Sequence, residues 1–315
     1  MEERKKFISV VTACYNEEGN IEALYNRIKS IFIDLPTYDY EHIFIDNDSH
    51  DKSREILRRI ASADPNVKVI FNTRNFGHIR SPLHAIYQAT GDAIIGIVAD
   101  FQDPPELIPE FLKKWEEGNK IVIGVKKKSK ENFLMFSLRK LFYSTLNRFS
   151  EIELVKNFTG FGLYDKSFID IVKEIDDPYP YFRGLIPEIG MQRYEIEYVQ
   201  PKRNKGKSSQ SFITLYDIAM LGFVNYSKIP LRMASFIGFF IAILSLLVAF
   251  GYFIYKLVFW YQFDVGLAPL VIGLFFFSSV QLIFIGIIGE YVGSILTQIQ
   301  HKKRALVIEK ERINF

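Results

Sequence analysis

Short apolar runs alternate with amphipathic segments along most of the chain before residue 200. Apolar runs of strand length lie at 7–13, 41–46, 67–72, 93–99, 121–125 and 194–199. Helical spacing of apolar residues occurs at 21–32, 52–61, 82–89, 105–117, 133–149 and 167–175. Because strands that alternate with helices are typical of crossover connections, the pattern predicts an α/β fold with a doubly wound, mostly parallel sheet.

Two uncharged apolar runs set the C-terminal third apart from the rest of the chain. They cover residues 233–255 and 267–289, and each exceeds the roughly 20 residues that a helix needs to cross a bilayer. A buried hairpin of helices in a soluble protein is the alternative, but uncharged runs of this length disfavour it. The sequence therefore predicts two transmembrane helices within residues 233–298.

Basic residues beside these runs predict the orientation of the chain in the membrane. Lys228 and Arg232 precede the first run, residues 301–304 follow the second, and the connection at 259–266 carries only Asp264. The positive-inside rule then places both termini in the cytoplasm, in a multi-pass protein of the cell inner membrane. The cytoplasmic catalytic domain would comprise residues 1–211, and residues 299–315 would form a cytoplasmic tail.

The segment at 212–232 differs from both regions because its apolar residues lie loosely on one side of a helix. It directly precedes the first apolar run, so we predict a juxtamembrane helix that lies in the interface and contacts membrane lipids. An ordinary packing helix is the alternative.

Composition narrows the range of functions. The single cysteine, Cys14, excludes an internal disulfide and fits a reducing cytosol. The N-terminal apolar run is too short for a signal peptide, and neither a Gly-x-Gly-x-x-Gly motif nor a Walker loop is present. With a net charge of only +3 we predict no nucleic-acid partner, and expect the basic clusters at 126–130 and 202–207 to meet phosphates or an anionic leaflet.

Polar side chains follow three of the predicted strands at the point where each strand ends. They occur at 15–20 and 46–51, and as Asp100, Gln102 and Asp103. Ligands of open α/β sheets bind at the carboxyl ends of the strands. Hard oxygen ligands such as Asp100 and Gln102 suit Mg²⁺ or Mn²⁺, which would in turn neutralise a diphosphate. The alternative is that an aspartate before proline only caps a turn or a helix.

Several motifs occur in one order along nearly the whole chain. They are Tyr15-Asn16-Glu17-Glu18, Asp46-Asn47-Asp48-Ser49, Arg74-Asn75-Phe76-Gly77, Asp100-Phe101-Gln102-Asp103-Pro104-Pro105, the segment 157–165, and Ile288-Gly289-Glu290-Tyr291. In this order they resemble the membrane-anchored polyprenyl-phosphate glycosyltransferases of glycosyltransferase family 2. That group includes bactoprenol glucosyltransferases and dolichyl-phosphate mannose synthases.

The resemblance implies a GT-A fold and an enzyme that passes a sugar from a UDP or GDP sugar to a polyprenyl phosphate, for cell-surface glycan biosynthesis. The residues implied to hold the nucleotide are Ala13, Tyr15, Glu17, Asp46, Asn47 and Ala99. The implied ligands of Mg²⁺ or Mn²⁺ are Asp100 and Gln102. Positive charge for the phosphates is implied at Lys126, Arg139, Arg203 and Lys207, the last two on a loop that closes over the site. We also predict a homo-oligomer.

The chain departs from the family at carboxylate positions. Val98 stands where the family's Asp-x-Asp motif begins, Gly160 where its proposed base lies, and Gly162 where it has arginine. A loss of activity is one interpretation. We prefer another, because a phosphate monoester has its second pKa near about 6 and is already an anionic nucleophile at neutral pH.

Catalysis would then depend on alignment and charge compensation by the metal at Asp100 and Gln102, together with Lys126 and Arg139. One displacement at the anomeric carbon would invert its configuration. A shifted base, Asp165 or Asp103, is the alternative within this mechanism. Two other functions stay open: transfer to another lipid or glycan acceptor, and a non-catalytic membrane scaffold that binds sugar nucleotides.

Overall fold

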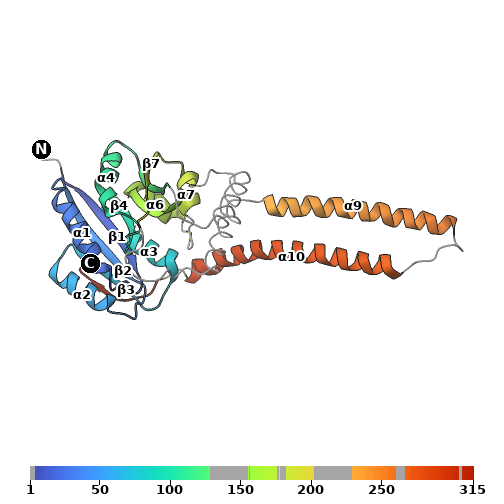
Figure 1. The fold of residues 1–315 in the computed structure, drawn as a ribbon, viewed down its shortest axis with the longest axis horizontal. Coiled ribbons are helices and arrows are strands. Elements are labelled where there is room, and N and C mark those ends of the chain that lie inside the picture. The colour runs from blue at the N-terminus through green and yellow to red at the C-terminus, as the bar shows by residue number, and fades with distance from the viewer. Residues whose placement is uncertain are drawn as a thin grey trace. The chain divides into compact units, whose positions relative to one another are not determined.

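The computed structural model describes residues 4–127, 155, 157–175, 177, 182–201, 229–259, 267–304 and 307–315. The chain divides into two units. The first contains the residues up to 144, those from 152 to 211 and those from 298 onward, and the second contains 145–151 and 212–297. Figure 1 shows the ribbon, with the helices and several of the strands labelled.

An eight-stranded sheet forms the centre of the first unit. In spatial order its strands are β7 (Arg193–Tyr198), β5 (Ile121–Lys126), β6 (Phe158–Asp165), β4 (Ala93–Val98), β1 (Lys6–Cys14), β2 (Tyr38–Asp46), β3 (Val67–Asn72) and β8 (Glu309–Ile313). The strands β1 to β4 are parallel, as predicted, and β5 is parallel to β7. The sheet as a whole is mixed, because β6 runs antiparallel to β4 and β5, and β8 runs antiparallel to β3.

Helices cover both faces of the sheet because apolar side chains alternate along its strands. Ile8 and Val10 of β1 share one core with α1 (Ile21–Ile33), α2 (Ser53–Ala63) and α4 (Ile108–Glu116), which follows the short 3₁₀ helix η1 (Pro105–Leu107). Val11 faces the other way and shares a second core with α3 (Gly77–Gln88), α6 (Lys166–Ile175) and α7 (Phe182–Ile189). The first unit is therefore a three-layer α/β/α domain.

Several elements differ from the sequence prediction, among them β6, where the sequence pattern predicted no strand. The helix α3 begins at Gly77 rather than at residue 82, because the Asn75 side chain accepts a hydrogen bond from the Gly77 backbone N–H at 2.8 Å and opens the helix earlier. The helix α7 lies in a stretch where the sequence pattern predicted no helix, and it buries Leu185 and Ile186. The predicted C-terminal tail instead adds β8 to the sheet, and the residues before it, up to 304, belong to the preceding helix.

The second unit contains the two predicted apolar helices. They are α9 (Ile229–Val258) and α10 (Leu267–Arg304), whose last residues belong to the first unit. A Cβ built on Gly238 would lie 3.2 Å from the Phe284 ring, and Tyr291 shares a hydrogen bond with the backbone of Leu231. These two contacts place α9 and α10 side by side in opposite directions.

Within the described residues, one stretch is long and apolar enough to cross a membrane. It is Gly273–Leu296 in α10, which has 24 residues, and none of its most apolar part is buried within the protein. In α9 the corresponding stretch, Leu231–Ser245, is shorter. Of the predicted amphipathic segment at 212–232, residues 212–228 lie outside the described residues, and the remainder begins α9.

Candidate active site at the strand ends

The carboxyl ends of four parallel strands meet at one edge of the sheet. Cys14 at the end of β1 lies opposite Asp46 at the end of β2, and Asp46 lies opposite Phe71 of β3. On the other side of β1, Ala13 lies opposite Val98, the last residue of β4. The polar segments that follow β1, β2 and β4 are therefore brought together at the edge where open α/β sheets bind ligands.

The chain turns sharply after β4 and presents Asp100 and Gln102 at this edge. Ala99 is buried, at 2% exposure, whereas Asp100 and Gln102 are half-buried. Phe101 between them has a φ of +60°, a left-handed conformation that turns the chain. The Gln102 backbone N–H donates to Oδ1 of Asp100 at 3.1 Å. The two predicted metal ligands thus lie within one tight turn.

The donor atoms of Asp100 and Gln102 fit a divalent cation. Carboxylate and amide oxygens are the hard ligands that Mg²⁺ and Mn²⁺ prefer. In the part of the chain that the structure describes, no three His, Cys, Asp or Glu side chains gather into a cluster that could hold an ion. A cation at this turn would therefore need further oxygen ligands from water or from the phosphates of a bound molecule.

Asp103 fastens the turn to the neighbouring strands. Its side chain is 2% exposed, accepts a 3.0 Å hydrogen bond from the Tyr198 hydroxyl, and accepts another from the backbone of Val98. Burial raises the pKa of Asp103 to about 6, although these hydrogen bonds and the charge of Lys126 act in the opposite direction. A buried carboxyl group that already holds two donors is badly placed to take a proton from a substrate, so the geometry disfavours Asp103 as a base.

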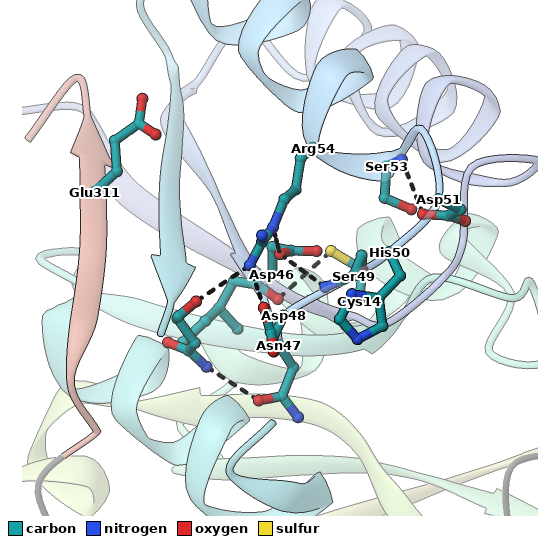
Figure 2. A network of polar contacts seen from close by, with 12 residues as sticks. Cys14, Asp46, Asn47, Asp48, Ser49, His50, Asp51, Ser53, Arg54 and Glu311 are labelled. Atoms are coloured by element: carbon teal, nitrogen blue, oxygen red, sulfur yellow. Dashed lines mark hydrogen bonds and ion pairs between the residues drawn. The ribbon is translucent and has the colours of Figure 1, made fainter. Parts of the chain in front are cut away.

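Asp46 is fully buried and paired with Arg54 of α2, as Figure 2 shows. Arg54 donates from Nε to Asp46 at 2.8 Å and from Nη2 to Asp48 at 2.7 Å and to the backbone oxygen of Asn72 at 3.2 Å. The Ser49 backbone N–H donates to the same Asp46 oxygen, Oδ2, at 3.1 Å. The other oxygen, Oδ1, is buried and has no hydrogen-bond partner among the described residues. Asp46 therefore keeps one free acceptor beneath the strand ends.

Asn47 uses its whole side chain within the protein. Its Oδ1 accepts hydrogen bonds from Asn72 Nδ2 at 3.1 Å and from the Phe76 backbone N–H at 2.9 Å. Its Nδ2 donates to Asn75 Oδ1 at 2.9 Å and to the Gly77 backbone oxygen at 3.3 Å. At 6% exposure, Asn47 links the end of β2 to the loop at 72–77. Its predicted contact with a base or ribose stays a prediction, as does that of Asp46.

Tyr15 and Glu17 follow β1 in different roles. Tyr15 is 37% exposed and offers its ring at the surface of the edge. Glu17 is half-buried and accepts a 2.6 Å hydrogen bond from Asn20, while its backbone N–H donates to Ser53 Oγ at 3.0 Å. The Glu17 backbone thus fastens the segment after β1 to α2, and the predicted contacts of Tyr15 and Glu17 with a nucleotide stay predictions.

Asp165 lies at the other end of the strands from Asp100. It is the last residue of β6 and pairs with Ala93, the first residue of β4, whereas Asp100 follows the other end of that strand. The six residues of β4 span about 20 Å. Asp165 accepts hydrogen bonds from Trp115 Nε1 at 2.7 Å and from Lys120 Nζ at 3.2 Å. This separation from Asp100 disfavours the predicted catalytic role of Asp165, whose hydrogen bonds hold α4 and the residue before β5 to the end of β6.

Two departures from the family lie close together on β4 and β6. Gly96 pairs with Gly162, so the antiparallel ladder brings Val98 toward Gly160, and a Cβ built on Gly96 would lie 3.3 Å from the Gly160 carbonyl oxygen. Val98 is 40% exposed, and Gly160 has a φ of +101°, which L residues rarely adopt. A Cβ on Gly162 would lie only 2.6 Å from the Val122 backbone oxygen, so this backbone admits no arginine there.

Several predicted positive charges fall outside the described residues. They are Arg139, Arg203 and Lys207, together with residues 128–130 of the first basic cluster. Lys126 is described: it ends β5, is half-buried, and lies near enough to Asp103 to lower the pKa of that carboxyl group. Lys126 therefore supplies positive charge at the same edge as Asp100.

Arg54 and Tyr198 were not predicted from the sequence to belong to the site. Arg54 stands eight residues after Asp46 in the first turns of α2, and this spacing was the available signal, because a helix that follows a strand end can return a long side chain to it. Tyr198 ends β7, which is parallel to β5, so its position as the last residue of a strand was a similar signal.

Comparison with known proteins agrees with this architecture. Residues 9–172 match the family Glycosyl transferase family 2. The chain is 33% identical over 311 residues to Uncharacterized glycosyltransferase YkcC of Bacillus subtilis, covering 97% of this chain and 96% of the relative. It is 31% identical over 308 residues to the SfII prophage-derived bactoprenol glucosyl transferase of Shigella flexneri, covering 98% and 99%. The chain belongs to glycosyltransferase family 2 and is a glycosyltransferase.

Among solved structures, the chain has a distant likeness to glucosyl-3-phosphoglycerate synthase from Mycobacterium tuberculosis. That structure is a complex with Mn²⁺, uridine diphosphate and phosphoglyceric acid. The TM-score is 0.46 at 19% sequence identity, over 70% of this chain and 76% of the other.

Proposed function

We propose that this chain is a membrane-anchored, inverting glycosyltransferase that moves a sugar from a UDP or GDP sugar to polyprenyl phosphate. The observation that carries the proposal is the 31% identity to a bactoprenol glucosyl transferase along 98% of the chain, because it includes both the sheet and the apolar helices. The product would be a lipid-linked sugar for cell-surface glycan biosynthesis.

The donor would bind over the ends of β1, β2 and β4. The exposed ring of Tyr15 is available to a base or ribose, and Asp100 and Gln102 would hold Mg²⁺ or Mn²⁺. A bound cation would supply charge compensation for the diphosphate leaving group. Lys126 adds positive charge beside the same turn.

The acceptor phosphate would attack without a protein base. Its oxygen forms a bond to the anomeric carbon while the bond from that carbon to the diphosphate oxygen breaks, so configuration inverts and the nucleoside diphosphate leaves. Two positions support this account. Asp103 is buried and accepts two hydrogen bonds, and Asp165 lies at the opposite end of β4 from Asp100. Arg139, Arg203 and Lys207 stay predicted partners of the phosphates.

The chain path supports a membrane hairpin. The strands β7 and β8 belong to one sheet, yet α9 and α10 lie between them in sequence, so the intervening chain must cross a membrane an even number of times or not at all. Large apolar side chains such as Phe236 and Phe275 are 74% and 67% exposed, which lipid would cover. We propose that α9 and α10 both span the inner membrane, with the sheet on the cytoplasmic side.

Turnover by the purified full-length enzyme tests the proposal. Undecaprenyl phosphate in detergent would be incubated with a panel of radiolabelled UDP and GDP sugars and Mg²⁺, and we expect one donor to give a labelled lipid. Label in another lipid or a glycan would favour the broader acceptor alternative. Nucleotide binding without turnover on any acceptor would favour the scaffold alternative.

A further inference from the structure

The last strand, β8, pairs with the C-terminal part of β3, from Val69 to Asn72. The register shifts between Phe71 and Asn72, so that Asn72 lies opposite Glu309. Immediately beyond, Thr73 donates two hydrogen bonds to the Ile308 backbone oxygen, from its N–H and from its hydroxyl, each at 3.0 Å. The segment at 308–313 therefore pairs with β3 and also holds the first residue of the loop that follows it.

Three side-chain contacts tie β8 to the helices on either side of this loop. Glu309 contacts His84 of α3 at 2.5 Å, and Glu311 pairs with Arg58 of α2 at 2.6 Å. Arg312 also donates a 3.1 Å hydrogen bond to Gln88 Oε1 at the end of α3. The chain around β8 thus contacts three elements that meet at the end of β2: the loop after β3, α2 and α3.

The same three elements fix Asp46 and Asn47. Asn72 and the backbone N–H of Phe76 donate to Asn47, and the backbone oxygen of Gly77 in α3 accepts from it. Arg54, one helical turn before Arg58 in α2, holds Asp46 and the Asn72 backbone oxygen. Figure 2 shows Arg54 reaching the end of β2 from α2, with Glu311 on β8 nearby. The contacts with Thr73, Arg58 and His84 therefore reach elements that also hold Asp46 and Asn47 at the end of β2.

We infer that β8 is a positioning strand for the donor half of the active site. It holds the loop at 72–77 against Asn47 and, through Arg58 and α2, holds Arg54 against Asp46. The inference rests on the proposed function, because it takes the nucleotide to bind over the ends of β1 and β2. A strand that only covered the sheet edge would leave nucleotide affinity unchanged.

Nucleotide binding by the full-length enzyme in detergent tests the inference. The double variant Glu309→Ala, Glu311→Ala removes the contacts with His84 and Arg58 and keeps the backbone pairing with β3. We expect the Kd of whichever nucleotide, UDP or GDP, binds the unmodified enzyme to rise about tenfold, as is typical when a residue acts through others. The KM for polyprenyl phosphate and kcat at saturating donor should stay within about twofold.

The matched control is Glu22→Ala. Glu22 of α1 pairs with Arg59 of α2 at 3.0 Å. This change therefore also removes an exposed ion pair from α2, but the partner that it removes belongs to α1 and not to β8. It should leave the Kd unchanged. Equal Kd values for the double variant and the unmodified enzyme, or an equal rise in the control, would overturn the inference.

A second measurement separates positioning from folding. The charge-reversed pair Arg58→Glu, Glu311→Arg should bind nucleotide more tightly than either single change. The single changes should keep the thermal midpoint of the unmodified enzyme, whereas a general loss of stability would lower it. If the unmodified enzyme transfers sugar and binds nucleotide while the variants bind equally well, only the role of β8 fails. If the unmodified enzyme neither binds nucleotide nor transfers sugar, the proposed function fails and the inference fails with it.

Discussion

Asp100 and Asp165 lie at opposite ends of β4, although both belong to segments that resemble family motifs. Asp100 follows the carboxyl end of the strand and is half-buried at the open edge. Asp165 pairs with Ala93 at the amino end, is 8% exposed and accepts hydrogen bonds from Trp115 and Lys120. The same change of aspartate to asparagine should therefore have opposite consequences at the two positions.

The first prediction is a separation of activity from stability. Asp100→Asn removes a carboxylate from the strand-end turn and should lower kcat/KM at least 100-fold, with little change in thermal midpoint. Asp165→Asn should keep kcat/KM within about threefold but lower the free energy of unfolding by about 1–3 kcal/mol, because the amide keeps one acceptor oxygen and some of the half-buried donors lose theirs. Steady-state kinetics and thermal unfolding of both variants check this. Loss of turnover in a folded Asp165→Asn enzyme would restore that residue as a candidate base.

The second prediction concerns pH. Burial raises the pKa of Asp165, but hydrogen bonds from Ser167, Trp115 and Lys120 outweigh it and leave the pKa below its ordinary value. A carboxyl group whose pKa is lower in the folded state contributes stability that is fully present above its unfolded pKa of about 3.9. This stability is lost as the pH falls from there through the folded pKa. The gap in thermal midpoint between the unmodified enzyme and Asp165→Asn should therefore be widest near neutral pH and narrow toward pH 3. A gap that widens on acidification would contradict the assignment.

The third prediction is a requirement for a divalent cation. Asp100 and Gln102 offer only two protein ligands, so a cation should exchange readily and excess chelator should abolish turnover. Added Mg²⁺ or Mn²⁺ should restore it, and Gln102→Ala should raise the metal concentration that gives half-maximal activity. Titration of metal-depleted enzyme with each ion measures this, and full activity in chelator would exclude the metal site.

The order of strands and helices could be predicted because it depends on local periodicity. The strand at 67–72 was predicted with its observed bounds, and the grouping of polar segments after β1, β2 and β4 followed from parallel pairing. The antiparallel entry of β6 was not predictable in this way. Its direction depends on tertiary pairing with Gly96 and Ile123. This direction places Asp165 at the opposite end of β4 from Asp100.

The C-terminal strand shows a second limit of sequence reasoning. Residues 309–313 read Glu-Lys-Glu-Arg-Ile, which has too few apolar positions to predict a strand. The structure supplies the missing stabilisation from outside the segment, because Glu309 and Glu311 contact His84 and Arg58, far away in the sequence. The role of Arg54 was not predicted for the same reason. Its contacts with Asp46 and Asp48 form only when α2 packs on the sheet.

The fourth prediction is the membrane topology. The native Cys14 is 3% exposed, and burial raises its pKa, so it should stay unlabelled on either side of the membrane. Cysteine at Phe259, which directly follows α9, should react with an impermeant maleimide in intact cells. Cysteine at the exposed Lys310 of β8 should react only after permeabilisation. The reverse pattern would contradict the cytoplasmic placement of the sheet.

The fifth prediction concerns the missing carboxylate at Gly160. This glycine has a φ of +101°, so any side chain there strains the backbone, and a loss of activity in Gly160→Asp alone would be ambiguous. Space is not the obstacle, because a Cβ built on Gly160 meets no atom within 4 Å. Gly160→Asn is the matched control, since asparagine has nearly the same shape and tolerates positive φ without adding charge.

Comparison of Gly160→Asp with Gly160→Asn isolates the effect of charge. If the acceptor phosphate is already an anionic nucleophile, the added carboxylate repels it, and Gly160→Asp should show a kcat/KM for the acceptor roughly three- to tenfold lower than Gly160→Asn. Salt should narrow the difference, because screening weakens repulsion between partly exposed charges. Both variants should bind nucleotide with similar affinity. If instead Gly160→Asp is faster than both Gly160→Asn and the unmodified enzyme, with a rate that rises as an added carboxyl group ionises, then a base assists the reaction and the account of an acceptor that needs none is wrong.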